Sequence, residues 1–138
     1  MLSGSGGIAR IVAAAPVVLA FAGCVVSPVA ENCRAQVEYR LYFGADTPAG
    51  EVSAIAWSAF VEGSLAPRVP EGLTIYQARG QWRDPRGRVL GEETRVVEVL
   101  RDGDAADEAN VTTVAREYRE QFRQESVLVT RKPVQSCY

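Results

Sequence analysis

The chain has 138 residues, with 15 Lys and Arg, 17 Asp and Glu, no histidine and 47% apolar residues. This length allows one domain, and the apolar fraction suits a globular core rather than a disordered chain. The net charge of −2 argues against nucleic-acid binding, and the missing histidine excludes Ser-His and Cys-His nucleophile pairs, haem bound by a proximal histidine, and histidine-based zinc sites.

The first 23 residues have the pattern of an export signal. Arg10 is the only charged residue among them, and the uncharged run that follows has 13 residues, from Ile11 to Gly23. A helix of that length reaches about 20 Å, which is short of the ~30 Å hydrocarbon core of a membrane. Pro16 inside the run disfavours a membrane-spanning helix further. We therefore expect a signal peptide over residues 1–23.

Two cleavage sites fit this signal. Residues 20–22 (Ala-Phe-Ala) form an A-x-A site, which would release a secreted soluble protein that begins at Gly23. Residues 19–24 resemble a bacterial lipobox, in which Cys24 is the lipid attachment site. We favour the lipoprotein, because lipidation of Cys24 leaves an even number of cysteines, Cys33 and Cys137, in an oxidising compartment. The expected location is the bacterial cell envelope, periplasmic or associated with the outer membrane, with residues 24–34 as a tether to the membrane anchor.

The next part of the chain has the pattern of a strand, a loop and a helix. Apolar and polar residues alternate from Ala35 to Gly44, as in a half-buried strand. Residues 45–50 are a loop by composition. Ser53 is a suitable N-cap for a helix that Pro67 ends. This helix has an apolar stripe at helical spacing, made of Trp57, Phe60, Val61 and Leu65.

Two strands joined by a tight turn follow this helix. Strand-forming residues run from Leu73 to Trp82, and residues 84–87 (Asp-Pro-Arg-Gly) match a type I turn. A third strand returns from Arg88 to Leu100, with Gly91 as a candidate bulge. Within this strand Glu92 and Glu93 are adjacent, so they point to opposite faces and cannot form a pair of catalytic carboxylates.

A second helix and a last strand complete the chain. Asp104 is a suitable N-cap for the helix, and its apolar residues recur with a period near 3.6. The acids around Asp104 lack the twelve-residue spacing of a calcium loop, so we expect a helix start and no metal site. The last strand is expected from Ser126 to Thr130, extending toward Val134.

The order of these elements is β-α-β-β-α-β, which predicts a ferredoxin-like α+β domain over residues 35–138. Right-handed crossovers give a four-stranded antiparallel sheet in the order 4-1-3-2, with two helices on one face. In this arrangement the start of the first strand lies beside the end of the last strand. Because Cys33 precedes the first strand and Cys137 follows the last one, we predict a disulfide between them.

Four segments carry distinctive motifs in combination. They are residues 41–44 (Leu-Tyr-Phe-Gly), 57–60 (Trp-Ser-Ala-Phe), 80–83 (Gly-Gln-Trp-Arg, with Gly87 in the next turn) and 124–128 (Gln-Glu-Ser-Val-Leu). Together they resemble a bacterial family of exported proteins, domain-of-unknown-function family 3574. The similarity covers about residues 37–130. The resemblance implies export and a single domain, and since the family has no assigned activity it implies no reaction.

The sheet face that the helices leave open is where we expect a ligand. Arg40 and Tyr42 lie on this face of the first strand, and Gln81, Trp82 and Arg83 lie at the end of the second. Arginine, glutamine and aromatic side chains that converge there can bind a small anionic or aromatic ligand. The alternative, which we weigh more heavily, is that Tyr42 and Trp82 pack at the rim of the sheet or at a dimer contact, while the arginines pair with nearby acids.

These observations leave two functions open. The first is a non-catalytic cell-envelope module that binds a ligand or partner through the open face, with no cofactor, no metal and no nucleic acid. The second is a small cofactor-independent enzyme with a pocket on the same face, which rests on fold analogy alone. An open and partly apolar sheet face also predicts a homodimer.

Overall fold

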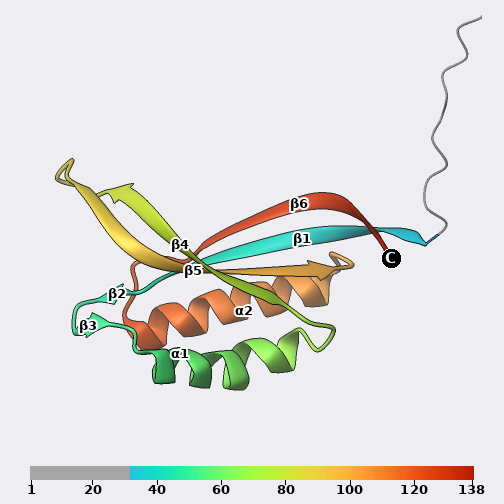
Figure 1. Ribbon diagram of the computed structural model, residues 1–138, viewed down its shortest axis with the longest axis horizontal. Coiled ribbons are helices and arrows are strands. Elements are labelled where there is room, and N and C mark those ends of the chain that lie inside the picture. Colours follow the sequence, from blue (N-terminus) through green and yellow to red (C-terminus); the bar gives the residue numbers. More distant parts are fainter. Residues whose placement is uncertain (1–31) are drawn as a thin grey trace, which may run out of the picture.

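The computed structural model describes residues 32–138, which form a four-stranded sheet with two helices on one face (Figure 1). The expected signal peptide, the lipid attachment site at Cys24 and nearly all of the expected tether lie outside the described residues. No helix in the described part of the chain is both long and apolar enough to span a membrane.

The four long strands form one antiparallel sheet, in the order β4-β5-β1-β6. They are β1 (Cys33–Gly44), β4 (Thr74–Arg83), β5 (Val89–Arg101) and β6 (Leu128–Cys137). The predicted α+β class and the antiparallel four-stranded sheet are confirmed. The end of β4 and the start of β5 rise away from the helices as a two-stranded hairpin (Figure 1).

The helical layer begins at the predicted caps. Ser53 accepts a hydrogen bond from the backbone N–H of Ala56 and starts α1 (Ala54–Phe60). The chain then continues through a π-helical turn, η1 (Val61–Leu65), and a 3₁₀ turn, η2 (Ala66–Arg68). Asp104 starts α2 (Ala105–Phe122) by accepting from the N–H of Asp107, and the helix ends at Arg123 in the left-handed conformation.

The core lies between the sheet and the helices. Every second residue of β1, namely Tyr39, Leu41 and Phe43, is buried on the helical side, as the alternating pattern predicts. Phe43 packs edge-on against Tyr118 of α2, with ring centroids 4.7 Å apart. Trp57 and Phe60 of α1 complete this aromatic cluster.

Strand β6 begins two residues later than the predicted Ser126 and ends at Cys137, three residues beyond the expected extension toward Val134. It pairs with β1 along its whole length, from Leu128 opposite Tyr42 to Cys137 opposite Cys33. Its middle contains Arg131, Lys132 and Pro133, which are unusual in central strands. On an edge strand, charges and proline are common because they block pairing with other chains. The charges and the proline of this strand therefore suit its position at the edge of the sheet.

Three further local features differ from the prediction. Strand β1 begins at Cys33, so the tether can extend no further than residue 32. The expected loop over 45–50 contains a short hairpin of β2 (Asp46–Thr47) and β3 (Gly50–Glu51). Gly91 is not a bulge, because it pairs with Gln81 in an uninterrupted register.

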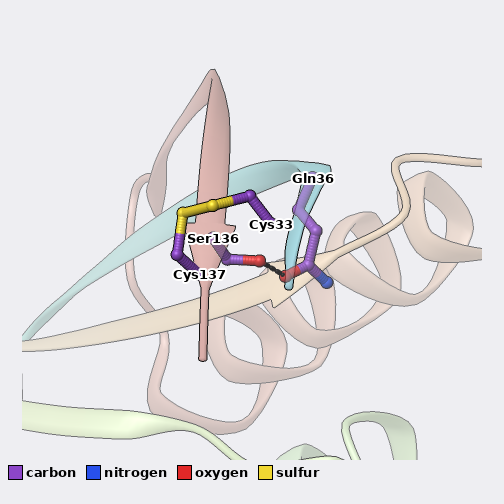
Figure 2. Close-up of a disulfide and its surroundings, with 4 residues drawn as sticks. All are labelled: Cys33, Gln36, Ser136 and Cys137. Carbon is purple, nitrogen blue, oxygen red and sulfur yellow. Dashed lines mark hydrogen bonds between the residues drawn. A yellow bond between two sulfur atoms is a disulfide. The ribbon is translucent and has the colours of Figure 1, made fainter. Parts of the chain in front are cut away.

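The predicted disulfide is confirmed. Cys33 and Cys137 are bonded, with Cα atoms 4.0 Å apart, well inside the ~7 Å limit for a bridge (Figure 2). Beside it the Ser136 hydroxyl donates a hydrogen bond of 2.5 Å to the side-chain oxygen of Gln36. Together they join the start of β1 to the end of β6.

Candidate functional site

A cleft of about 660 Å³ opens on the sheet face opposite the helices, which we call the open face. This volume is in the range of sites for single small molecules. The lining residues come from all four long strands, from β2 and the turn after it, and from the segment between α2 and β6. Tyr42 and Gly44 mark the face, because they alternate along β1 with the core residues Leu41 and Phe43.

The floor of the cleft contains two glycines, Gly44 of β1 and Gly80 of β4, on the two strands that flank β5. A Cβ atom at Gly44 would lie 2.5 Å from a carboxylate oxygen of Glu92. A Cβ atom at Gly80 would lie 3.1 Å from the hydroxyl of Thr94. The two glycines therefore leave room for polar side chains to lie along the sheet, with space above them.

Apolar side chains border this floor in two cross-strand pairs. Trp82 of β4 lies opposite Leu90 of β5, and Tyr42 of β1 lies opposite Leu128 of β6. Trp82 is 38% exposed and Leu128 is 59% exposed, so both present apolar surface at the cleft. Trp82 offers an aromatic surface on which a planar ring can stack, and Leu128 adds apolar surface.

Glu92 is the carboxylate on the floor. It is half-buried, and within residues 32–138 it has no hydrogen-bond or ion-pair partner. Burial, with a further contribution from the charge of Asp46, raises the pKa of Glu92 above its usual value. Its neighbour Glu93 points to the other face and lies 3.8 Å from Arg79 in an exposed ion pair, so the predicted opposition of the two acids is observed.

The layer beneath the floor holds the end of β1 in place. The Tyr118 hydroxyl donates a 2.8 Å hydrogen bond to the carbonyl of Gly44, and burial raises the pKa of Tyr118 to about 12. Arg95 donates to the carbonyl of Val52 and lies over the ring of Trp57, 5.2 Å from its centroid. Because its pKa is raised, the Tyr118 hydroxyl stays protonated at neutral pH, and its hydrogen bond keeps Gly44 against the helical layer.

The structure brings together three of the five residues expected from the sequence to bind a ligand. Tyr42, Gln81 and Trp82 line the cleft. Arg40 lies outside it and binds Glu98 at 2.8 Å and Glu38 at 3.1 Å. Arg83 also lies outside it and donates to the carbonyl of Gly87 at 2.6 Å. Arg40 therefore pairs with acids, as the alternative interpretation expected, whereas Arg83 binds a backbone carbonyl instead of an acid.

Sequence reasoning missed Glu92, Asp46 and Thr94 as residues of the cleft. Glu92 was set aside because it had no partner acid on its own face, although a single carboxyl suffices for a binding site. The signal that marks it is Gly80, the cross-strand partner of Glu92. A glycine inside a strand often marks a place where a ligand or another chain approaches closely.

The sequence matches the family described as "Protein of unknown function (DUF3574)" over residues 38–138. The chain belongs to this family. The match confirms the resemblance drawn from the four motifs, three of which, residues 41–44, 80–83 and 124–128, contribute to the cleft of this DUF3574 protein. No functionally curated protein matches the sequence.

Two solved structures share the fold of this DUF3574 domain. A phage SAM lyase in complex with S-methyl-5′-thioadenosine has a TM-score of 0.56 and 19% sequence identity, and the match covers 75% of this chain and 90% of that chain. A phage SAM lyase in the apo state has a TM-score of 0.54 and 18% identity, with the same coverage. At this level of identity the likeness shows the fold.

The acids at the start of α2 have a structural role in this DUF3574 protein. Asp107 accepts hydrogen bonds from Arg101 and from the N–H of Gly103, while Asp104 caps the helix. Across residues 32–138, no three acids or cysteines are grouped so that they could hold a metal ion.

Proposed function

We propose that this protein is an exported, lipid-anchored component of the bacterial cell envelope that binds a small organic ligand in the open-face cleft. The proposed topology of the binding domain is ferredoxin-like, with the element order β-α-β-β-α-β. Export and anchoring rest on the sequence of residues 1–24, with Cys24 as the lipid attachment site. Ligand binding rests on the cleft itself, whose hollow floor and exposed Trp82 have no evident role in packing.

The cleft suits a ligand with a planar ring. Trp82 and Tyr42 supply aromatic surface at its two sides, and Thr94 and Glu92 supply polar groups on the floor that can fix the orientation of the ligand. Binding sites for small molecules commonly combine apolar walls with a few placed polar groups in this way.

A second candidate function is catalysis in the same cleft. The observation that favours it is Glu92, a carboxyl with a raised pKa in a concave site, which is the setting of many general acids and bases. The fold likeness to phage SAM lyase supports a nucleoside or a sulfonium compound as the substrate class, by analogy. Incubation of the purified protein with SAM, followed by analysis for S-methyl-5′-thioadenosine, tests this candidate. Release of the thioadenosine by wild-type protein and not by Glu92→Gln supports catalysis, and no release by the wild type rules out this substrate.

Ligand binding is tested by the small molecules that the full-length protein retains on purification, identified by mass spectrometry. We expect the wild-type protein to retain a ring compound and Trp82→Ala to lose it. Val89→Ala is the matched control, because Val89 is exposed on the same hairpin and does not line the cleft. Equal retention by wild type and Trp82→Ala, or no retained compound in either, contradicts the proposal.

The anchor is tested separately by Cys24→Ala. We expect this variant to accumulate as unprocessed precursor or to be released as soluble protein, because the thiol that accepts the lipid is gone. Wild-type protein that fractionates as soluble, with Gly23 at its N-terminus, would show the alternative cleavage site to be correct.

A further inference from the structure

We propose that the cleft selects an organic cation, and that Glu92 is the residue that binds its positive charge. The ligand class is a planar ring that carries an ammonium-type or other onium centre. This inference deepens the proposed ligand-binding function and rests on it.

The first support is that the other buried and half-buried acids of the domain form ion pairs with arginines. Seven acids are buried or half-buried within residues 32–138, and six of them lie within 4 Å of an arginine. The six are Glu38, Asp84, Glu98, Asp107, Glu108 and Glu117. Glu92 is the seventh, and no arginine in this part of the chain pairs with it. A half-buried carboxylate without a partner is costly, and a bound cation would remove that cost.

The second support is the charge around Glu92. Asp46 on β2 is a second acid of the cleft, and its charge raises the pKa of Glu92 further. Arg79 is 77% exposed at its side chain and pairs with Glu93, and Arg123 is exposed where α2 ends. Glu125 is exposed beside Arg123 and offsets it. The floor is therefore negative, which attracts a cation and repels an anion.

The third support is the position of Trp82 relative to Glu92. Gly80 lies directly opposite Glu92 across β4 and β5, and Trp82 lies two residues further along β4, on the same face. Two residues along a strand span roughly 7 Å. A ligand above Gly80 can therefore contact Trp82 with its ring and Glu92 with a charged group about that far away. An aromatic face next to a carboxylate is a general arrangement for binding an organic cation.

The test compares three indole compounds of similar size whose side groups differ in charge. They are tryptamine (cationic), indole-3-acetamide (neutral) and indole-3-acetate (anionic), titrated calorimetrically into the full-length protein in detergent near neutral pH. Since a hydrogen bond to a charged group contributes about 1.5–3 kcal/mol, we expect tryptamine to bind about tenfold or more tightly than the amide, and the acetate to bind most weakly.

Two variants assign the preference to one residue. Glu92→Gln is expected to remove the preference for tryptamine while leaving binding of the amide within about twofold, because the ring contacts remain. Glu62→Gln is the matched control, with the same change of charge at an exposed acid outside the cleft, and it is expected to retain the preference. An unchanged far-ultraviolet spectrum of Glu92→Gln shows that the variant is folded.

The outcomes separate this inference from the proposed function. Equal binding of tryptamine and the amide by the wild type, or an unchanged preference in Glu92→Gln, overturns the selection of a cation and leaves ligand binding supported. A protein that binds none of the three compounds and retains no ring compound on purification overturns both.

Discussion

At the scale of single residues, the folded protein shifts the pKa values of two carboxyl groups, Glu92 and Asp84, in opposite directions. Asp84 accepts hydrogen bonds from the backbone N–H groups of Arg88 and Arg86 and from the Arg88 side chain, which lower its pKa. Glu92 has glycines and another acid around it, and its pKa is raised. Asp84 stabilises the turn between β4 and β5. Glu92 has no comparable structural role, and residues kept at such a cost are commonly functional.

The contrast predicts opposite effects of pH on stability. Because the folded state raises the pKa of Glu92, its contribution to the free energy of unfolding falls as the pH rises through the interval between the unfolded and folded pKa values. Glu92→Gln is therefore expected to be more stable than the wild type at pH 7, and the gain should be absent near pH 4. Urea unfolding at the two pH values measures this difference.

Asp84→Asn provides the comparison of opposite sign. The lowered pKa of Asp84 means that its stabilisation is present at neutral pH and is lost as the pH falls through the folded value. We expect Asp84→Asn to be less stable than the wild type at pH 7. A Glu92→Gln variant that is also less stable at pH 7 would show that the Glu92 carboxylate has a stabilising partner.

At the scale of elements, the sequence predicted the segments whose structure depends on a local pattern, such as alternating polarity or an N-cap residue. The alternation in β1 marks its core face, and Ser53 and Asp104 begin their helices as expected. Strand β6 was expected from Ser126 toward Val134 and runs from Leu128 to Cys137, because pairing with β1 rather than local composition sets its ends. The cleft depends on contacts between distant segments, so the proximity of Gly44, Gly80 and Glu92 could not be predicted from spacing.

The cap of α2 gives a prediction at this scale. Asp104→Ala removes the hydrogen bond of 2.8 Å to the N–H of Asp107 and leaves that donor without its capping partner. Loss of such a cap costs about 1 kcal/mol of stability. We expect a lower urea midpoint with an unchanged slope, and no loss of tryptamine binding, because the other end of α2 adjoins the cleft. A cap variant as stable as the wild type would contradict this assignment.

At the scale of the whole molecule, the disulfide joins the two ends of the domain. It connects cysteines 104 residues apart, and the chain-entropy model assigns a loop of this length about 4–5 kcal/mol, although measured values are often smaller. We expect reduction to lower the melting temperature while the far-ultraviolet spectrum at room temperature stays native, since the paired strands and the core remain. An unchanged melting temperature after complete reduction would show that the bridge contributes nothing to stability.

The open face also predicts self-association. Tyr76, Trp82 and Leu128 are each more than a third exposed, and a second copy of the chain is the partner that we propose for them. Sedimentation of the protein at micromolar concentration is expected to show a dimer for the wild type and a monomer for Leu128→Arg. A wild-type protein that sediments only as a monomer would contradict the dimer and would leave the cleft open to solvent.

The central claim is that the open-face cleft is the ligand site of this protein, and the most direct measurement is an amide chemical-shift map by NMR. Full-length protein in detergent is titrated with tryptamine, and the shift changes are assigned along the chain. We predict that the largest changes fall at Tyr42, Gly80, Trp82, Glu92 and Thr94, and that Glu92→Gln reduces them. Changes confined to the helical side, around Ser64 and Glu117, or no changes at saturating tryptamine, would contradict the claim.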